Sequence, residues 1–184
     1  MEQIVQLNSG AKLSPHFTLG EFTKSGSHPE VYNIPSHEAI ANLKRLCTWL
    51  EVLRERYNDK YVVPPSSLSS RPSAPSPLSS RPSAARGEIS EEPIRINSGY
   101  RSPQLNRAIG GAANSNHLTG CAVDIRVENM EQLIRYAAIL LDISNESHQD
   151  FDELLIEKNR YGAVWLHFAV RPKENRRMVM FINA

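Results

Sequence analysis

A serine- and proline-rich tract in the middle of the chain sets the strongest limit on what these 184 residues can fold into. Ser and Pro supply most positions from Pro64 to Ala85, where the heptapeptide LSSRPSA occurs twice, at Leu68–Ala74 and Leu78–Ala84. A tract so poor in large apolar side chains cannot bury enough surface to offset the entropy lost on ordering. We therefore expect a single domain over residues 1–184, interrupted at 64–92 by a flexible insertion.

The proline spacing of this insertion fits two interpretations. Pro and Arg at regular intervals are typical of a docking peptide for an aromatic-lined groove. A short duplication is also readily tolerated in a surface loop. We favour the surface loop, because nothing else in the tract carries chemistry.

The overall composition is that of an ordinary globular protein and excludes several classes of function. Hydrophobic residues make up 40% of the chain and charged residues 22%, as in typical soluble domains. The 21 Lys and Arg residues nearly balance the 20 Asp and Glu residues, which argues against a protein that coats nucleic acid or an anionic membrane. No apolar run approaches the roughly 18 residues of a membrane helix. We expect a monomer with no nucleic-acid partner and no membrane insertion.

The amino-terminal sequence MEQIVQLNSGAKLSPHF lacks the basic region and apolar run of a secretory signal. We therefore expect the protein to be cytoplasmic as synthesised. A target outside the membrane would then be reached only after release, as in phage-type lysis.

Cysteine and glycine residues are expected to serve packing rather than chemistry. Cys47 and Cys121 provide neither a disulfide framework nor a CxxC metal knuckle, so we expect two small buried hydrophobes. We expect Gly99, Gly111 and Gly120 to meet backbone requirements, either a positive φ or a close approach.

Helices and strands are mixed along the chain, and their order predicts the fold class. Capping residues and apolar periodicity predict helices from Leu19, over 36–58, over 103–109 and over 129–142. Short apolar runs predict strands at 94–96, 121–126, 151–157, 163–170 and 178–182. Because a hairpin-length loop joins two of the last strands, we expect an α+β fold with a mainly antiparallel sheet flanked by helices.

Two strand residues are chemically out of place in their apolar surroundings. Asp124 interrupts the strand sequence CAVDIR, and His167 interrupts VWLHFAV. A buried carboxylate needs a partner or a metal, and His117 lies near enough in sequence to share an ion with Asp124. A lone strand histidine is usually a hydrogen-bonded core residue. Spacing alone therefore leaves two interpretations open, a core hydrogen-bond network or a metal site of His117, Asp124 and His167.

The segment INSGYRSPQLNRAIGGAANSNHLTGCAVDIR resembles the signature of the zinc D-Ala-D-Ala carboxypeptidases, in the hedgehog/DD-peptidase superfamily. The shared pattern is SGYRSP, an Asn-containing helix, GG, and S-x-H-x-x-G-x-A-x-D. The resemblance continues upstream through LSPHFTLGEFTKS and LEVLRER, and downstream through WLHFAV and RPKENRR. It implies a zinc peptidase that cleaves D-amino-acid-containing bonds of peptidoglycan stem peptides, as a carboxypeptidase or an endolysin-type endopeptidase.

The resemblance also implies roles for individual residues. His117, Asp124 and His167 match the Zn²⁺ ligands, and three protein ligands leave one position open, as in catalytic sites. Arg101 matches the arginine that stabilises the oxyanion, with a structural salt bridge as the alternative. Ser115 matches a serine that binds substrate, although a loop serine also commonly bonds its own backbone.

The general base is the point at which this sequence departs from the family pattern. Several branches place an acid three residues before the second histidine, where this chain has Val164. The preceding strand, FDELLIE, offers substitutes. We choose Glu157, with Glu153 as the alternative, since Glu153 would lie opposite His167 in one register. A catalytically inactive zinc-stabilised module that binds the cell wall remains the alternative function.

Overall fold

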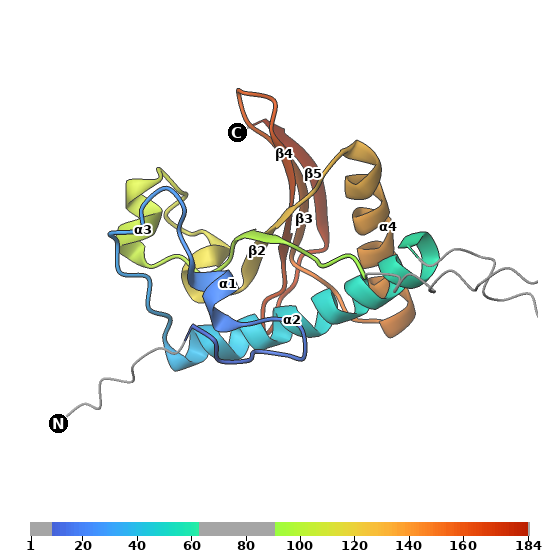
Figure 1. The fold of residues 1–184 in the computed structure, drawn as a ribbon, viewed down its shortest axis with the longest axis horizontal. Helices are drawn as coiled ribbons and strands as arrows, with labels where there is room; N and C mark the ends of the chain where they lie inside the picture. Colours follow the sequence, from blue (N-terminus) through green and yellow to red (C-terminus); the bar gives the residue numbers. More distant parts are fainter. Residues whose placement is uncertain (1–8, 63–90, 184) are drawn as a thin grey trace, which may run out of the picture.

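The computed structural model describes residues 9–62 and 91–183, and the predicted insertion from Pro64 to Ala85 lies outside them (Figure 1). The strands in the described part form one sheet: β1 (Ile96–Ser98), β2 (Ala122–Arg126), β3 (Glu153–Lys158), β4 (Val164–Ala169) and β5 (Met178–Asn183). Their order is β1-β2-β4-β3-β5. Neighbouring strands are antiparallel except β3 and β5, which run parallel. The predicted α+β class with a mainly antiparallel sheet is confirmed.

The described helices are α1 (Leu19–Thr23), α2 (His37–Tyr57), the π-helical turn η1 (Asn58–Val62), α3 (Pro103–Ala108), the 3₁₀ turn η3 (Asn116–Thr119) and α4 (Met130–Ser147). The predicted caps are confirmed, since Ser36, Ser102 and Asn129 each accept a backbone N–H of the first turn. None of the helices within 9–62 and 91–183 combines the length and the hydropathy that crossing a bilayer requires.

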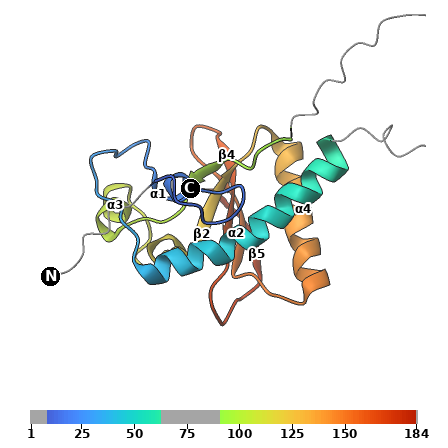
Figure 2. The same ribbon diagram turned by 60° about the horizontal axis from the view of Figure 1, so that its bottom comes forward.

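The helices divide between the two sides of the sheet (Figures 1 and 2). In both views α4 lies on one side of the sheet and α3 on the other, while α2 runs past the sheet toward α4. The ring of Trp49 on α2 packs 5.4 Å from the ring of Phe168 on β4. Because side chains alternate along a strand, His167 points to the face of β4 opposite these core side chains.

The end of α2 differs from the sequence expectation, because the helix continues into η1 instead of stopping at Asn58. The buried Asn58 amide donates from Nδ2 to the Arg54 carbonyl (2.8 Å) and to the Glu92 carbonyl (3.0 Å). Its Oδ1 accepts the Glu92 N–H at 2.7 Å. Asn58 therefore satisfies the backbone at the helix end and fastens it to the segment that follows residues 63–90.

Two further boundaries were predicted wrongly. α4 runs beyond Asp142 to Ser147, because Ile143 and Ser144 are buried and continue the apolar face of the helix. The first strand was expected at 94–96 and begins at Ile96, since Ile94 packs into the core at 3% exposure. The other strand limits shift by one or two residues.

Candidate metal centre

The register of the sheet places Asp124 of β2 directly beside His167 of β4. The two residues are Cα partners in an antiparallel pair, and directly paired residues point to the same face. Their side chains meet there, with His167 Nδ1 lying 2.9 Å from Asp124 Oδ1. The face of the sheet opposite Trp49 and Phe168 thus carries a carboxylate and an imidazole side by side.

His117 reaches the same place from η3. Ser115 Oγ accepts the His117 backbone N–H at 3.3 Å and caps this turn, and Gly120 ends it with a φ of +71°. A Cβ on Gly120 would lie 2.6 Å from the Ala39 carbonyl oxygen on α2, so only glycine allows this packing. The substrate-binding role implied for Ser115 stays a prediction.

The orientation of the His117 ring is set by the loop that follows β1. His117 Nδ1 lies 2.5 Å from the Gly99 carbonyl oxygen, and a carbonyl can only accept, so Nδ1 carries the hydrogen. The other ring nitrogen, Nε2, points toward the cluster and lies 3.3 Å from Asp124 Oδ1. A hydrogen bond of this kind is how proteins orient a histidine toward a metal.

The three side chains fit a zinc ion. Ligand atoms of His117, Asp124 and His167 lie within 4.8 Å of one another, and their side chains are only 2–7% exposed. Two imidazoles and a carboxylate are a donor set that zinc prefers, and three protein ligands leave a fourth position open.

The charges of the cluster are strongly coupled. Burial alone would raise the pKa of Asp124, but the neighbouring imidazoles outweigh burial and hold this pKa well below its usual range. Burial alone would lower the pKa of His167, whose ring is bonded to Asp124 and Glu153, and these bonds raise the pKa to about 9. Without a metal, the cluster therefore holds a proton that a cation must displace.

Arg101 lies against the cluster through its guanidinium group. Its Nη2 donates to Asp124 Oδ2 at 2.5 Å, and its Nε donates to Ser98 Oγ at 2.9 Å. Asp124 therefore uses one oxygen for the two histidines and the other for Arg101. The salt bridge that the sequence left as an alternative is present, and an oxyanion role stays a prediction.

Glu153 and Glu157 occupy the same face of β3 but meet different partners. Leu155, not Glu153, is the partner of His167 across β3 and β4, so the register suggested for Glu153 was wrong. Glu153 is paired with Ala169 and reaches diagonally, so that its Oε2 lies 3.3 Å from His167 Nε2. This hydrogen bond lowers the pKa of Glu153 to about 2.

Asn116 and Arg176, which the sequence did not assign to the site, hold Glu153 in place together with Asp152, a residue of the strand FDELLIE from which the sequence offered substitutes for the base. Asn116 Nδ2 donates to Glu153 Oε2 at 2.9 Å and to Asp152 Oδ2 at 2.8 Å. Arg176 Nη2 donates to Glu153 Oε1 at 2.5 Å and also to the fully buried Asp152. The signal for Asp152 was available, because it is a charged residue beside the apolar Phe151, whereas nothing local marks Arg176.

Glu157 takes no part in these ion pairs. It is paired with Trp165 at the neighbouring position of β4, on the same face as His167. Burial, helped by the negative charge of Asp124, raises the pKa of Glu157, while the positive charge of His167 opposes this shift. A carboxyl whose pKa is raised beside a metal site is suited to proton transfer.

Comparison with known proteins relates part of this chain to a family. Residues 83–151 match the model of the family described as Peptidase M15. The matched region includes Arg101, His117 and Asp124 and ends before β3, so the contributions of Glu157 and His167 rest on the structure.

One curated relative is similar over a short segment. Over 42 residues the chain is 43% identical to the zinc D-Ala-D-Ala carboxypeptidase of Streptomyces albus G. This segment is 23% of the chain and 16% of the length of that protein.

A groove of about 510 Å³ opens beside the cluster. It is lined by Arg101, which is bonded to Asp124, and by Trp165, which precedes His167 by two residues on β4. Leu105 of α3 and Ile109, which follows α3, contribute apolar surface, and Lys24 also lines the groove. The groove therefore combines apolar surface with two cations.

We expect zinc affinity to depend strongly on pH. A metal can bind His167 only after its proton is lost, so apparent affinity should rise by about tenfold per pH unit between pH 6 and 8 and level off above about 9, the pKa of this histidine. Competition with a chromophoric chelator, corrected for the chelator's own protonation, measures this slope. Glu153→Gln weakens a hydrogen bond that raises the pKa of His167, so its zinc affinity should level off at a lower pH than that of the wild type. A wild-type zinc affinity that does not change with pH would contradict a protonated His167.

The same proton links pH to stability. The folded, metal-free protein holds it more tightly than the unfolded chain, whose histidine titrates near 6.5. Its contribution to stability is therefore complete below about 6.5 and is lost as pH rises through about 9. Melting temperatures of the metal-free protein should fall over this interval, and zinc should reverse the fall.

Proposed function

We propose that the chain is a zinc metallopeptidase that hydrolyses D-amino-acid-containing peptide bonds in peptidoglycan stem peptides. The observation that carries this proposal is the meeting of His117, Asp124 and His167 beside a groove lined by Arg101. The match of residues 83–151 to the model of the family described as Peptidase M15 supports the reaction class, and the name of the Streptomyces albus G relative supports the metal and the substrate class. When bound, zinc supplies Lewis-acid polarisation of the peptide carbonyl and an acidified water.

The protein's own groups divide the remaining work. Glu157 takes the proton of the attacking water on its carboxylate and returns it to the leaving amine, because its raised pKa keeps both states accessible. Glu153 is bonded to His167 Nε2 and to Arg176, so it orients the ligand instead of exchanging protons.

Arg101 acts on both the ligand and the substrate. Its Nη2 and Nε hold Asp124 and Ser98, and the guanidinium also faces the groove, where its other N–H groups can donate to the carbonyl oxygen as negative charge develops there. The apolar residues of α3 in the groove wall accommodate the alkyl side chains of a D-alanine-type substrate.

A second candidate function follows from one specific departure. Val164 occupies the position where several family branches carry an acid, and valine cannot transfer a proton. If Glu157 does not replace that acid, the same scaffold is a zinc-stabilised module that binds the cell wall without cleaving it.

The proposal is tested with the zinc-loaded full chain and two substrates, a stem pentapeptide ending in D-Ala-D-Ala and a crosslinked muropeptide dimer. Mass spectrometry distinguishes release of D-Ala, which identifies a carboxypeptidase, from conversion of dimer to monomer, which identifies an endopeptidase. A chelator should abolish the reaction and zinc should restore it. Wild-type protein that binds zinc and peptidoglycan but cleaves neither substrate would establish the binding module instead.

A further inference from the structure

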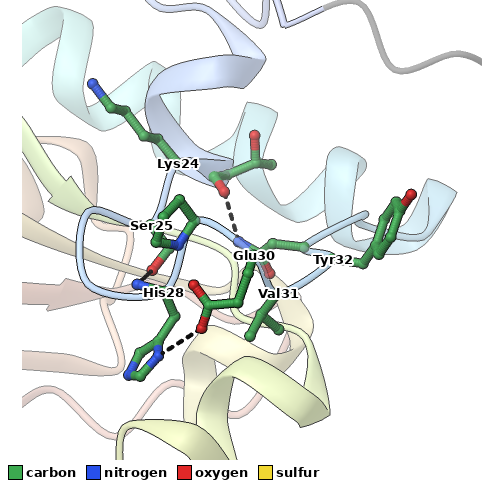
Figure 3. Close-up of a pocket in the computed structure, with 9 residues that line it drawn as sticks. Lys24, Ser25, His28, Glu30, Val31 and Tyr32 are labelled. Carbon is green, nitrogen blue, oxygen red and sulfur yellow. Dashed lines mark hydrogen bonds and ion pairs between the residues drawn. The ribbon is translucent and has the colours of Figure 1, made fainter.

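Asn33, in the loop between α1 and α2, is hydrogen-bonded through its side chain to the SGYRS segment. Figure 3 shows this loop around a hollow of about 560 Å³, with His28 bonded to Glu30 and the Tyr32 ring turned away from both. The hollow itself holds no cluster that would bind a ligand. The residue of interest is Asn33, which also lines the hollow.

The Asn33 amide makes three hydrogen bonds to backbone groups. Its Nδ2 donates to the Tyr100 carbonyl and to the Thr23 carbonyl, each at 2.8 Å. Its Oδ1 accepts the Ser102 N–H at 2.7 Å. The side chain thus closes the loop that begins at Thr23 and grips the peptide groups on both sides of Arg101.

The other backbone groups of this segment are also bound. The Arg101 N–H donates to the His117 carbonyl at 3.0 Å, and the Gly99 carbonyl accepts the His117 ring nitrogen. Ser102 Oγ donates to the Tyr32 carbonyl at 2.9 Å. One continuous hydrogen-bond network therefore sets the positions of Arg101 and of His117. The loop between α1 and α2 contributes the Asn33 side chain and the Tyr32 carbonyl to this network.

We propose that Asn33 is a positioning residue, which fixes the backbone around Arg101 so that the guanidinium meets Asp124 and the groove at the geometry required for turnover. The proposal rests on the proposed function for its kinetic consequence. It also predicts an effect on the metal site that needs no substrate, because Arg101 bonds both Asp124 and the His117 backbone.

The test uses full-length wild type, Asn33→Ala, Asn33→Asp, Arg101→Ala and the double variant Asn33→Ala/Arg101→Ala. Asn33→Asp keeps the acceptor for Ser102 and the volume of the side chain but loses both donors, so it guards against loss of folding in the alanine variant. The matched control is Tyr32→Ala, because the neighbouring ring is 82% exposed and only the backbone of Tyr32 joins the network. Circular dichroism and melting temperature are recorded for each.

We expect Asn33→Ala and Asn33→Asp to lower kcat by about 10–100-fold with little change in KM, and Tyr32→Ala to match the wild type. In the Arg101→Ala background the further loss of kcat from Asn33→Ala should be less than about twofold, because Asn33 cannot act through a guanidinium that is no longer present. An equal loss in both backgrounds would overturn the proposal and leave a general structural role.

Cobalt absorption spectra separate failure of this inference from failure of the proposed function. The d–d bands of the Co²⁺-loaded Asn33 variants should shift relative to wild type, and those of Tyr32→Ala should not. If wild type cleaves neither peptidoglycan substrate, the peptidase proposal fails, while shifted bands would still support Asn33 as a positioning residue. Unshifted bands together with unchanged kcat would refute it.

Discussion

Substitution of Glu157 by Gln is expected to lower kcat by about 10²–10⁴-fold, the range that a general acid–base contributes. Glutamine fills the same space but cannot accept a proton, so binding of zinc and of peptide should persist. The structure supports this choice because Glu157 forms no ion pair with the residues that the structure describes, and burial raises its pKa. The measurements are kcat and KM on the stem peptide, with zinc content determined by atomic absorption.

Glu153→Gln is the matched control on the same strand face. Glu153 is bonded to His167 Nε2, and loss of such an outer partner typically weakens metal binding by about 10–100-fold. We therefore expect Glu153→Gln to lose zinc affinity and to recover most of its activity at saturating zinc. The opposite pattern, in which Glu153→Gln is inactive with full zinc and Glu157→Gln is active, would assign proton transfer to Glu153.

The second large effect is expected from His117→Ala. Removal of one ligand from a three-ligand site should reduce zinc affinity by more than about 100-fold, beyond what an outer partner contributes, and should reduce hydrolysis to the uncatalysed rate. Chelator competition measures the affinity, and the muropeptide assay measures the rate. His37→Ala is the control, since His37 is an exposed residue at the start of α2.

The buried position of His117 makes a second variant desirable. Asp124→Asn preserves the shape of the side chain and its bond to Arg101 but removes the charge that the metal requires. It should lose zinc to a similar extent while remaining folded by circular dichroism. Hydrolysis by either variant at the wild-type rate would contradict the metal-dependent mechanism.

The sequence alone indicated the candidate centre because two of its members violate the pattern of their strands. Asp124 and His167 are polar residues in apolar runs, and period-two alternation requires every such residue to face away from the core on which Phe168 packs. The helix caps were equally visible, since Ser36 and Asn129 act within three residues. These signals are local, because each pattern lies within a single stretch of chain.

The partners that act across long separations were not predictable in the same way. Whether Glu153 or Leu155 lies beside His167 depends on the register of two strands, and a register that keeps the same face inward can shift by two residues without changing the pattern. Arg176 reaches Glu153 from the loop before β5, and Asn33 reaches the peptide groups on both sides of Arg101 from the loop before α2. Neither position is marked by its neighbours in the sequence.

The hydrogen bonds between Asn58 and Glu92 bear on how the length of the chain can change in evolution. They join the two points where the chain leaves and re-enters the described domain, on either side of residues 63–90. In proteins generally, each doubling of the length of a flexible loop between two fixed points costs only about 0.6 kcal/mol of closure entropy. The two copies of LSSRPSA lie between these two points in the sequence, so a duplication there adds residues without removing either partner of the bonds between Asn58 and Glu92.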